Sequence, residues 1–152
     1  MKKGTPYLIR IIKSLSFLIT LSVNAQTLIE FDWAKNFSST TSSSWGFSIA
    51  TDEYGNIYST GFFQGTIDFD PGPEVYNLTS MGGFDIYISK LDNSGNFIWA
   101  KNIGGSGSEI PRSIRVDGNG NIYLTGSFNQ TTDFDPGDGV YNMTTFGDSD
   151  IF

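Results

Sequence analysis

The sequence contains neither cysteine nor histidine. Without cysteine there is no disulfide, no thiol nucleophile, no lipid-anchored N-terminal cysteine and no thiolate ligand for a metal. Without histidine, a serine–histidine catalytic pair and an imidazole-bound zinc ion are excluded as well. The fold must therefore be held together by a packed core or by stacked repeats, with no covalent cross-link.

Basic residues are scarce, and four of the nine lie close to the N-terminus. They form a basic start before an apolar run at 15–23, and small residues at Val23 and Ala25 occupy the positions that a signal peptidase reads. A membrane anchor is the alternative, but a spanning helix needs about 20 apolar residues and this run is shorter. We therefore expect residues 1–25 to be a secretory signal peptide, cleaved before Gln26. The mature protein would then be secreted or held at the cell surface, with no membrane-spanning segment.

The mature chain is strongly acidic. Removal of residues 1–25 takes away four basic residues and none of the sixteen acidic ones, so the formal net charge falls from −7 to −11. A surface of that charge repels phosphate backbones, so nucleic acid is not an expected partner. Acidity is also typical of exported proteins that need only to stay soluble.

One segment of the sequence occurs twice. Residues 48–87 align without a gap onto residues 113–152, 65 positions later, and more than half of the aligned pairs are identical. A second echo pairs 31–36 with 97–102, 66 positions apart. A repeat of this kind indicates one structural unit stacked on copies of itself.

Short runs of β-branched and aromatic residues separated by Gly, Asn, Asp and Ser predict strands throughout the repeat. The expected strands are the first at 46–51 and 112–116, the second at 56–62 and 121–127, the third at 85–91 and from 150 onward, and the fourth at 96–102 with an earlier copy at 30–36. Turns of the form Asp-x-x-Gly-Asn begin at Asp52, Asp92 and Asp117, where the Asp caps the turn and the Gly supplies a positive φ. The excursion at 64–83 is either two further short strands or an ordered loop.

Four antiparallel strands repeated at a fixed spacing are typical of a β-propeller blade. One blade cannot cover both of its faces, so aromatic side chains such as Tyr58, Trp99 and Tyr123 are expected to pack between blades. The predicted organisation is a signal peptide at 1–25, an N-terminal segment with a strand-four copy at 26–44, a first repeat at 45–103 and a second, truncated repeat at 104–152. Since stacked repeats need about three or more units, we expect these two blades to be a fragment of a larger propeller.

Three sequence motifs carry a family resemblance. Asp-x-x-Gly-Asn-Ile-Tyr-x-Thr-Gly, Asp-Phe-Asp-Pro-Gly and Asp-Ile-Tyr-Ile-Ser-Lys-Leu-Asp-x-x-Gly-Asn-Phe-x-Trp-Ala-Lys follow one another in order. Together they resemble the SBBP repeats, which are β-propeller repeats of exported bacterial proteins, often of the Bacteroidetes type. The resemblance covers about residues 31–152 and implies an extracellular location and a propeller of about seven blades. It implies no agreed catalytic activity.

The Asp-Phe-Asp-Pro-Gly loops contain the candidate metal ligands. Asp68 and Asp70 lie two residues apart, as do their copies Asp133 and Asp135. Carboxylates at this spacing can bind Ca²⁺, which takes 6–8 oxygen ligands. Turn chemistry is the favoured alternative, because Asp caps turns, Pro fixes φ and Gly permits the reversal. No other cofactor is expected.

An acidic rim is expected on the face that carries these loops. If the blade-to-blade segment at 104–109 lies beside the excursions, seven acids share this face: Asp68, Asp70, Glu74, Glu109, Asp133, Asp135 and Asp138. A cationic ligand is one interpretation of that rim.

The predicted function is that of a non-catalytic scaffold or binding module, with an extracellular glycan, a protein or the cell envelope as candidate ligand. The alternative is part of an extracellular carbohydrate-active enzyme whose catalytic residues lie outside this segment. Paired carboxylates could split glycosides. Here, however, the acids recur from blade to blade, and that suits a scaffold better than a single acid and base in different environments.

Overall fold

The computed structural model describes residues 30–39 and 41–152, and residues 33–152 form one compact unit. The predicted signal peptide at 1–25 lies outside the described residues. The described part of the chain contains eleven strands and no helix, so no helix in it could cross a membrane. The predicted all-β fold is confirmed.

The strands follow the order of the repeat. The first repeat contains β1 (Ser43–Thr51), β2 (Ile57–Gln64), β3 (Thr66–Asp68), β4 (Asn77–Thr79), β5 (Asp85–Leu91) and β6 (Phe97–Gly105). The second contains β7 (Glu109–Val116), β8 (Ile122–Phe128), β9 (Thr131–Asp133), β10 (Asn142–Thr144) and β11 (Asp150–Ile151).

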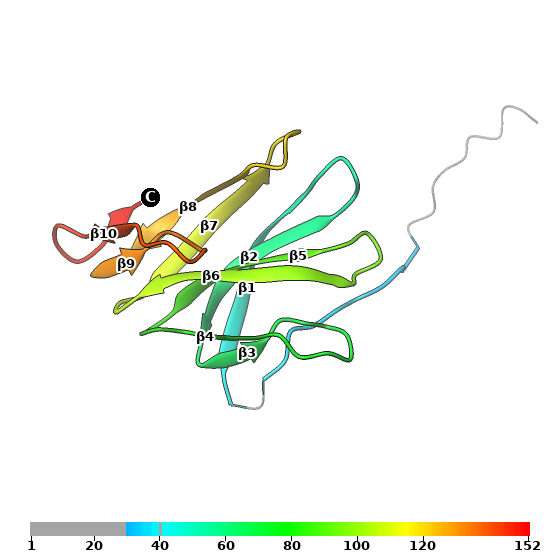
Figure 1. Cartoon of the computed structure of the whole chain (residues 1–152), viewed down its shortest axis with the longest axis horizontal. Helices are drawn as coiled ribbons and strands as arrows, with labels where there is room; N and C mark the ends of the chain where they lie inside the picture. Colours follow the sequence, from blue (N-terminus) through cyan, green and yellow to red (C-terminus); the bar gives the residue numbers. More distant parts are fainter. Residues whose placement is uncertain (1–29, 40) are drawn as a thin grey trace, which may run out of the picture. The chain divides into compact units, whose positions relative to one another are not determined.

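Each repeat builds one antiparallel sheet. In the first, the strands lie side by side in the order β1-β2-β5-β6, and in the second the order is β7-β8-β11. The excursions form the hairpins β3-β4 and β9-β10, which settles the choice between two strands and a loop in favour of strands. Figure 1 shows β3 and β4 to one side of the first sheet and β7 and β8 to the other. The expected four-stranded pattern is therefore complete in the first repeat, and the second repeat contains its first three strands.

Most strand predictions agree with the structure to within a few residues, and β5 agrees at both ends. The strand predicted at 30–36 is wrong, because those residues form no strand. Its copy in β6 pairs with β5 along its length. Among the described residues, no copy of the repeat's third strand lies beside 30–36. The backbone groups of this segment therefore have no β-ladder to join.

The three Asp-x-x-Gly-Asn turns have the same hydrogen bonds. In the first, Oδ1 of Asp52 accepts the backbone N–H groups of Tyr54 and Asn56 (3.0 and 2.9 Å), and Oδ2 accepts the Asn56 side-chain amide (2.8 Å). Gly55 adopts a φ of 77°, a region that other residues rarely enter. The turns at Asp92 and Asp117 repeat the pattern, which confirms the predicted cap.

The first sheet is buried on both faces. One face packs against the second repeat in a cluster made of Tyr58, Ile86, Ile88, Ile103 and Ile114. The other face packs under the β3-β4 hairpin in a cluster made of Phe63, Ile67, Phe69, Tyr87 and Ala100. The central strand β5 contributes to both, and all of its residues except Lys90 are buried. Tyr58 and Trp99 pack between the repeats as predicted, whereas Tyr123 is 59% exposed.

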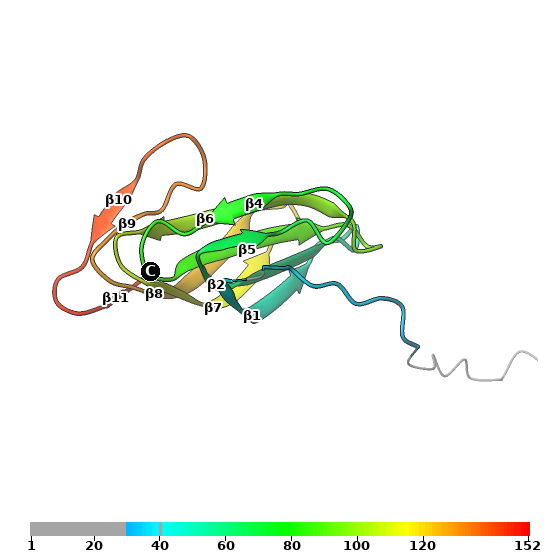
Figure 2. The same cartoon turned by 90° about the horizontal axis from the view of Figure 1, so that it is seen from below.

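Each excursion hairpin reaches back to the segment that precedes its repeat. In the second repeat, β9 pairs with β6 through Gly104↔Asp133 and Gly105↔Thr132. In the first, Asp68 of β3 pairs with Ser38, and Ser38 holds the position that corresponds to Gly104. The hairpin therefore ties consecutive repeats together with backbone hydrogen bonds. Figure 2 shows β9 beside the end of β6 from a second direction.

A group of aromatic rings fixes each hairpin to its sheet. Phe69, from the Asp-Phe-Asp-Pro-Gly loop, is fully buried and lies 5.3 Å from Phe63 and 4.9 Å from Tyr87 between ring centroids. Phe37 closes the group at 5.0 Å from Phe69. The second repeat reproduces the arrangement with Phe134 at 5.1 Å from Phe128 and 5.0 Å from Phe152. The phenylalanine between the two aspartates is thus the anchor of the loop.

Replacing that anchor should destabilise the protein. We expect Phe69→Ala to lower the free energy of unfolding by about 3–5 kcal/mol, because it removes a fully buried ring and leaves a cavity. Urea unfolding of the mature chain, followed by tryptophan fluorescence, measures the change. The matched control is Phe146→Ala, whose ring is 98% exposed and whose loss should change stability by less than about 0.5 kcal/mol. Equal effects of the two variants would contradict the anchoring role.

Candidate functional site

The carboxylates of the Asp-Phe-Asp-Pro-Gly loops cap turns. Oδ1 of Asp68 accepts the backbone N–H of Asp70 (3.0 Å) and that of Tyr76 (2.9 Å). Oδ1 of Asp70 accepts the N–H of Gly72 (2.7 Å). One carboxylate oxygen of each residue is therefore already used to hold the loop closed.

The second copy has the same geometry. Oδ1 of Asp133 accepts the N–H groups of Asp135 and Tyr141 (3.0 and 2.8 Å), and Oδ1 of Asp135 accepts the N–H of Gly137 (2.7 Å). Across residues 30–39 and 41–152, no three Asp, Glu, His or Cys side chains lie close enough together to hold a metal ion. The turn interpretation accounts for these contacts, and a calcium ion at Asp68, Asp70, Asp133 and Asp135 stays a prediction.

The prediction of an acidic rim is wrong for one of its seven acids. Glu109, which was placed on the rim with the loop acids, is the first residue of β7 and is fully buried. The segment before it is shorter than expected, since Gly104 and Gly105 belong to β6. Its backbone N–H donates to the carbonyl of Phe84 at 2.7 Å, and this bond draws the residue into the joint between the sheets.

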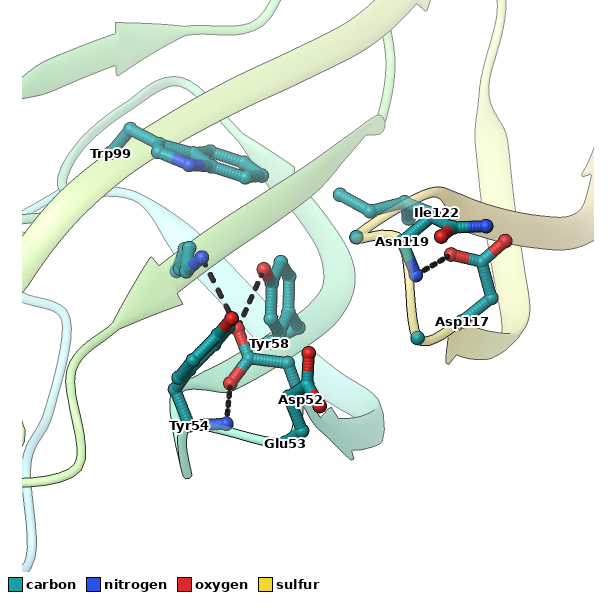
Figure 3. Close-up of a pocket in the computed structure, with 11 residues that line it drawn as sticks. Asp52, Glu53, Tyr54, Tyr58, Trp99, Asp117, Asn119 and Ile122 are labelled. Carbon is teal, nitrogen blue, oxygen red and sulfur yellow. Dashed lines mark hydrogen bonds and ion pairs between the residues drawn. The ribbon is translucent and has the colours of Figure 1, made fainter.

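A pocket of about 350 Å³ lies between the turns that join the first and second strands of the two repeats. Figure 3 shows Trp99 and Tyr58 on one side of it and the turn from Asp117 to Asn119 on the other. The ring of Tyr58 meets Trp99 edge to face at 6.1 Å. The residues that line the pocket are Asp52, Glu53, Tyr54, Tyr58, Lys90, Trp99, Asp117, Gly118, Asn119, Gly120 and Ile122.

A charge pair forms one wall of this pocket. Lys90 Nζ lies 3.3 Å from Oδ2 of Asp52 and 4.7 Å from the centre of the Tyr58 ring. Desolvation opposes ionisation of Asp52, but hydrogen bonds from Asn56, Lys90 and Tyr54 outweigh it and lower the pKa of Asp52 to about 2. Asp52 is therefore a carboxylate at neutral pH, and its oxygens are engaged by its own turn, by Lys90 and by the hydroxyl of Tyr58 (3.2 Å).

The pocket is better suited to binding than to proton transfer. The carboxylate of Asp117 is engaged in the same way as that of Asp52, accepting the hydroxyl of Tyr123 at 3.2 Å in addition to its turn. Neither acid is free to act as a general acid or base. The polar side chains that remain exposed at the rim belong to Glu53, Tyr54 and Asn119, beside the partly buried ring of Trp99.

A cluster of aromatic rings, two of them exposed, lies at the other end of β1 and β2. Phe62 is at its centre, with ring centroids 4.8 Å from Trp45, 5.4 Å from Phe47 and 4.9 Å from Phe84. Trp45 and Phe47 are 47% and 42% exposed. We refer to these four residues as the aromatic cluster.

The cluster is not reproduced in the second repeat. The positions of Trp45, Phe47, Phe62 and Phe84 correspond to Ile110, Arg112, Ser127 and Ser149. Phe47 and Arg112 are equivalent bulge residues, and the guanidinium of Arg112 lies 5.7 Å from the ring centre of Phe47. A bulge turns its extra residue out of the ladder, so the two side chains can meet across the repeats.

The aromatic cluster was not predicted from the sequence, because the prediction rested on the residues that the two repeats share. The signal was present in the same alignment, as aromatic positions in the first copy that become polar or aliphatic in the second. The burial of Glu109 together with Asp85 was not predicted either, since an acid in a Gly- and Ser-rich stretch is typical of an exposed loop.

Comparisons with known proteins support a repeat of this type. Residues 98–130 match the model of a family described as a β-propeller repeat, SBBP. The chain is also 32% identical, over 97 residues, to an uncharacterized WD repeat-containing protein of Acanthamoeba polyphaga mimivirus. That alignment covers 55% of this chain and 7% of the viral protein's length. No solved structure matches the chain.

Calcium removal tests the loop carboxylates. We expect a chelator such as EDTA to leave the thermal midpoint of the mature chain unchanged, because backbone N–H groups already occupy Oδ1 of Asp68 and Asp133. Differential scanning fluorimetry with and without added Ca²⁺ measures this. A midpoint that rises with Ca²⁺ in the wild type, but not in Asp68→Asn, would instead support the calcium site.

Proposed function

We propose that this chain is part of an exported, non-catalytic β-propeller scaffold that binds an extracellular glycan through the aromatic cluster of its first repeat. The two stacked sheets and the match to a propeller-repeat family support the scaffold. The basic and apolar N-terminal sequence at 1–25 supports export.

The observation that carries the binding proposal is the departure of the aromatic cluster from the repeat. Turns, hairpin contacts and the aromatic anchor are reproduced in both repeats, as expected of parts that form the fold. Trp45 and Phe47 have no aromatic counterpart, and they remain exposed although burial of such rings is favourable. Exposed aromatic groups that the fold does not require are typical of a binding surface.

A glycan suits the chemistry of this surface. The C–H faces of a pyranose ring are apolar and stack on flat aromatic side chains, while the sugar hydroxyls need polar partners. The guanidinium of Arg112, beside Phe47, is exposed and offers up to five N–H donors. The negative net charge of the mature chain makes nucleic acid an unfavourable ligand.

Catalysis has no comparable support. The partly buried carboxylates at the loops and turns are held by backbone N–H groups and recur from repeat to repeat. Asp85 and Glu109 form an unusual acid pair, but both are sealed from solvent. The described residues therefore favour binding over glycoside hydrolysis.

A sedimentation assay tests the glycan proposal. We expect the mature chain to co-sediment with at least one of chitin, cellulose and purified peptidoglycan. Trp45→Ala should weaken that binding about ten-fold, which corresponds to the roughly 1.4 kcal/mol of a lost stacking contact. Phe146→Ala removes an exposed ring outside the cluster and should bind as the wild type does.

Two results would contradict this assignment. Absence of binding to all three polysaccharides would overturn the glycan ligand. Wild-type binding by both Trp45→Ala and Phe47→Ala would place the ligand elsewhere, with the pocket at Trp99 as the next surface to test.

Export is tested independently. We expect protein expressed from the full sequence in a Gram-negative host to be recovered outside the cytoplasm with Gln26 as its N-terminal residue, because the signal peptide is cleaved there. N-terminal sequencing or intact-mass measurement provides the readout. Leu18→Arg places a charge in the apolar run and should block cleavage. Wild-type protein that stays in the cytoplasm with residues 1–25 attached would contradict the proposal.

A further inference from the structure

Two acidic side chains are fully buried where the two repeats meet. Asp85 is the first residue of β5 and Glu109 the first of β7, and neither side chain is exposed to solvent. The backbone N–H of Glu109 donates to the carbonyl of Phe84 (2.7 Å), which brings the starts of the two strands together. The pair therefore lies at the joint between the repeats.

Each of these carboxylates has one oxygen in use and one without a partner. Oδ2 of Asp85 accepts the backbone N–H of Met81 (3.1 Å) and the side-chain amide of Asn102 (3.2 Å). Oε1 of Glu109 accepts the hydroxyl of Thr132 (2.7 Å). The remaining oxygens, Oδ1 of Asp85 and Oε2 of Glu109, are buried without a hydrogen bond. A buried oxygen without a donor is costly, and a charged one more so.

No basic side chain compensates this pair. The one ion pair in the described part of the chain joins Lys90 to Asp52, at the opposite end of β5. The other charged residues on the strands around the joint are Lys101 on β6, Arg112 and Arg115 on β7, and Asp133 on β9. Arg115 is exposed, and its Nη1 donates to the carbonyl of Ile114 (2.8 Å). Lys101 and Arg112 are exposed and form no ion pair, and Asp133 is a further negative group whose Oδ1 is bound by two backbone N–H groups. β2 carries no charged residue.

Two carboxylates that share a dry site without a cation cannot both be ionised at low cost. We propose that Asp85 and Glu109 hold one proton between them in mildly acidic solution, and that the joint between the repeats weakens as the solution becomes neutral and this proton is lost. The proton supplies the donor that the two unpaired oxygens lack. The joint is then a pH-sensitive connection built into the stacking of the repeats.

The expected titration of the two acids supports this proposal. Burial, with the nearby charge of Asp85 adding to it, raises the pKa of Glu109 to about 7, and burial also raises the pKa of Asp85. Since the folded pKa of Glu109 lies above its ordinary value of 4.5, its contribution to stability is fully present below about pH 4.5 and is lost as the pH rises through about 7.

The arrangement is specific to this joint. Asp85 is reproduced as Asp150, whose Oδ2 accepts the N–H of Phe146 at 3.0 Å, just as Asp85 accepts that of Met81. Glu109, in contrast, corresponds to Ser44 in the first repeat. The aspartate is thus part of the repeated fold, and the glutamate is what makes this joint titratable.

The test compares the mature wild type with Glu109→Gln between about pH 5 and pH 9. The glutamine amide has the shape of the protonated acid and keeps an acceptor for Thr132, but it cannot ionise. We expect the unfolding constant of the wild type to rise by up to about ten-fold for each pH unit between about 5 and 7, where the folded chain still holds a proton that the unfolded chain has released, and to level off above about 7. Glu109→Gln should be nearly independent of pH in that range. Urea unfolding at each pH provides the constants.

Two further variants complete the experiment. Glu53→Gln removes an exposed acid and should keep the wild-type pH dependence. Asp85→Asn removes the other half of the pair and should also flatten the profile, so the test does not depend on one variant folding well. A wild-type profile that is flat between about pH 5 and 7, or a slope there that persists in both Glu109→Gln and Asp85→Asn, would overturn the proposal.

A bound cation is the competing explanation, and the same samples exclude or establish it. If Ca²⁺ raises the wild-type midpoint at pH 8 but leaves Glu109→Gln unchanged, the pair is a metal site and the shared proton is wrong. Asp68→Asn, measured in parallel, separates this joint from the loop carboxylates. We expect no effect of Ca²⁺ that depends on Glu109.

Discussion

A β-sheet that is apolar on both faces has to be covered on both sides, and the rest of this structure follows from that requirement. β5 carries Ile86 and Ile88 toward one face and Tyr87 toward the other, so neither side can be left to water. The second repeat covers the first face, and the β3-β4 hairpin covers the second. Three features bury these two apolar faces: the alternation of side chains along the strands, the stacking of the repeats, and the long excursion between the second and third strands.

The repeat separates the parts that form the fold from the parts that give this chain its own character. Three features occur twice with nearly the same geometry. They are the capped turns at Asp52 and Asp117, the pairing of each hairpin with the segment before its repeat, and the buried ring of Phe69 or Phe134. The aromatic cluster and Glu109 occur once. A feature that the fold does not need in both copies is open to another role, and for that reason we look for function at the departures.

Much of the fold could be predicted from the sequence, because the local chemistry is unambiguous. Gly55 follows an Asp that caps the turn, and Ile57 then begins a strand with β-branched and aromatic residues. The N-terminal copy at 30–36 shows the limit of this reasoning. It has the residues of β6, but a strand also needs a neighbour to accept its hydrogen bonds, and the pattern of one segment does not reveal whether the neighbour is present.

The candidate sites were harder to predict, because they depend on contacts between residues far apart in the chain. The sequence predicts a role for Asp68 and Asp70 and none for Phe69 between them, yet the ring is the buried group and the carboxylates serve the turn. Glu109 lies in a stretch that reads as an exposed loop, and its burial follows from a backbone bond to Phe84, 25 residues earlier. Only the comparison with Ile110 and Arg112 shows that the aromatic side chains of Trp45 and Phe47 are not part of the repeated pattern.

Because each hairpin pairs with the segment before its repeat, the repeats are completed in a fixed order as the chain is synthesised. The end of β6 is finished by β9, which belongs to the next repeat, so a chain emerging from the ribosome or through a secretion channel cannot complete one unit until part of the following unit has appeared. The end of β6 therefore stays unpaired until β9 has been synthesised, and the last repeat to be made is the least complete. This dependence comes from strands of three residues, whose side chains also serve the core at Ile67 and bind Glu109 at Thr132.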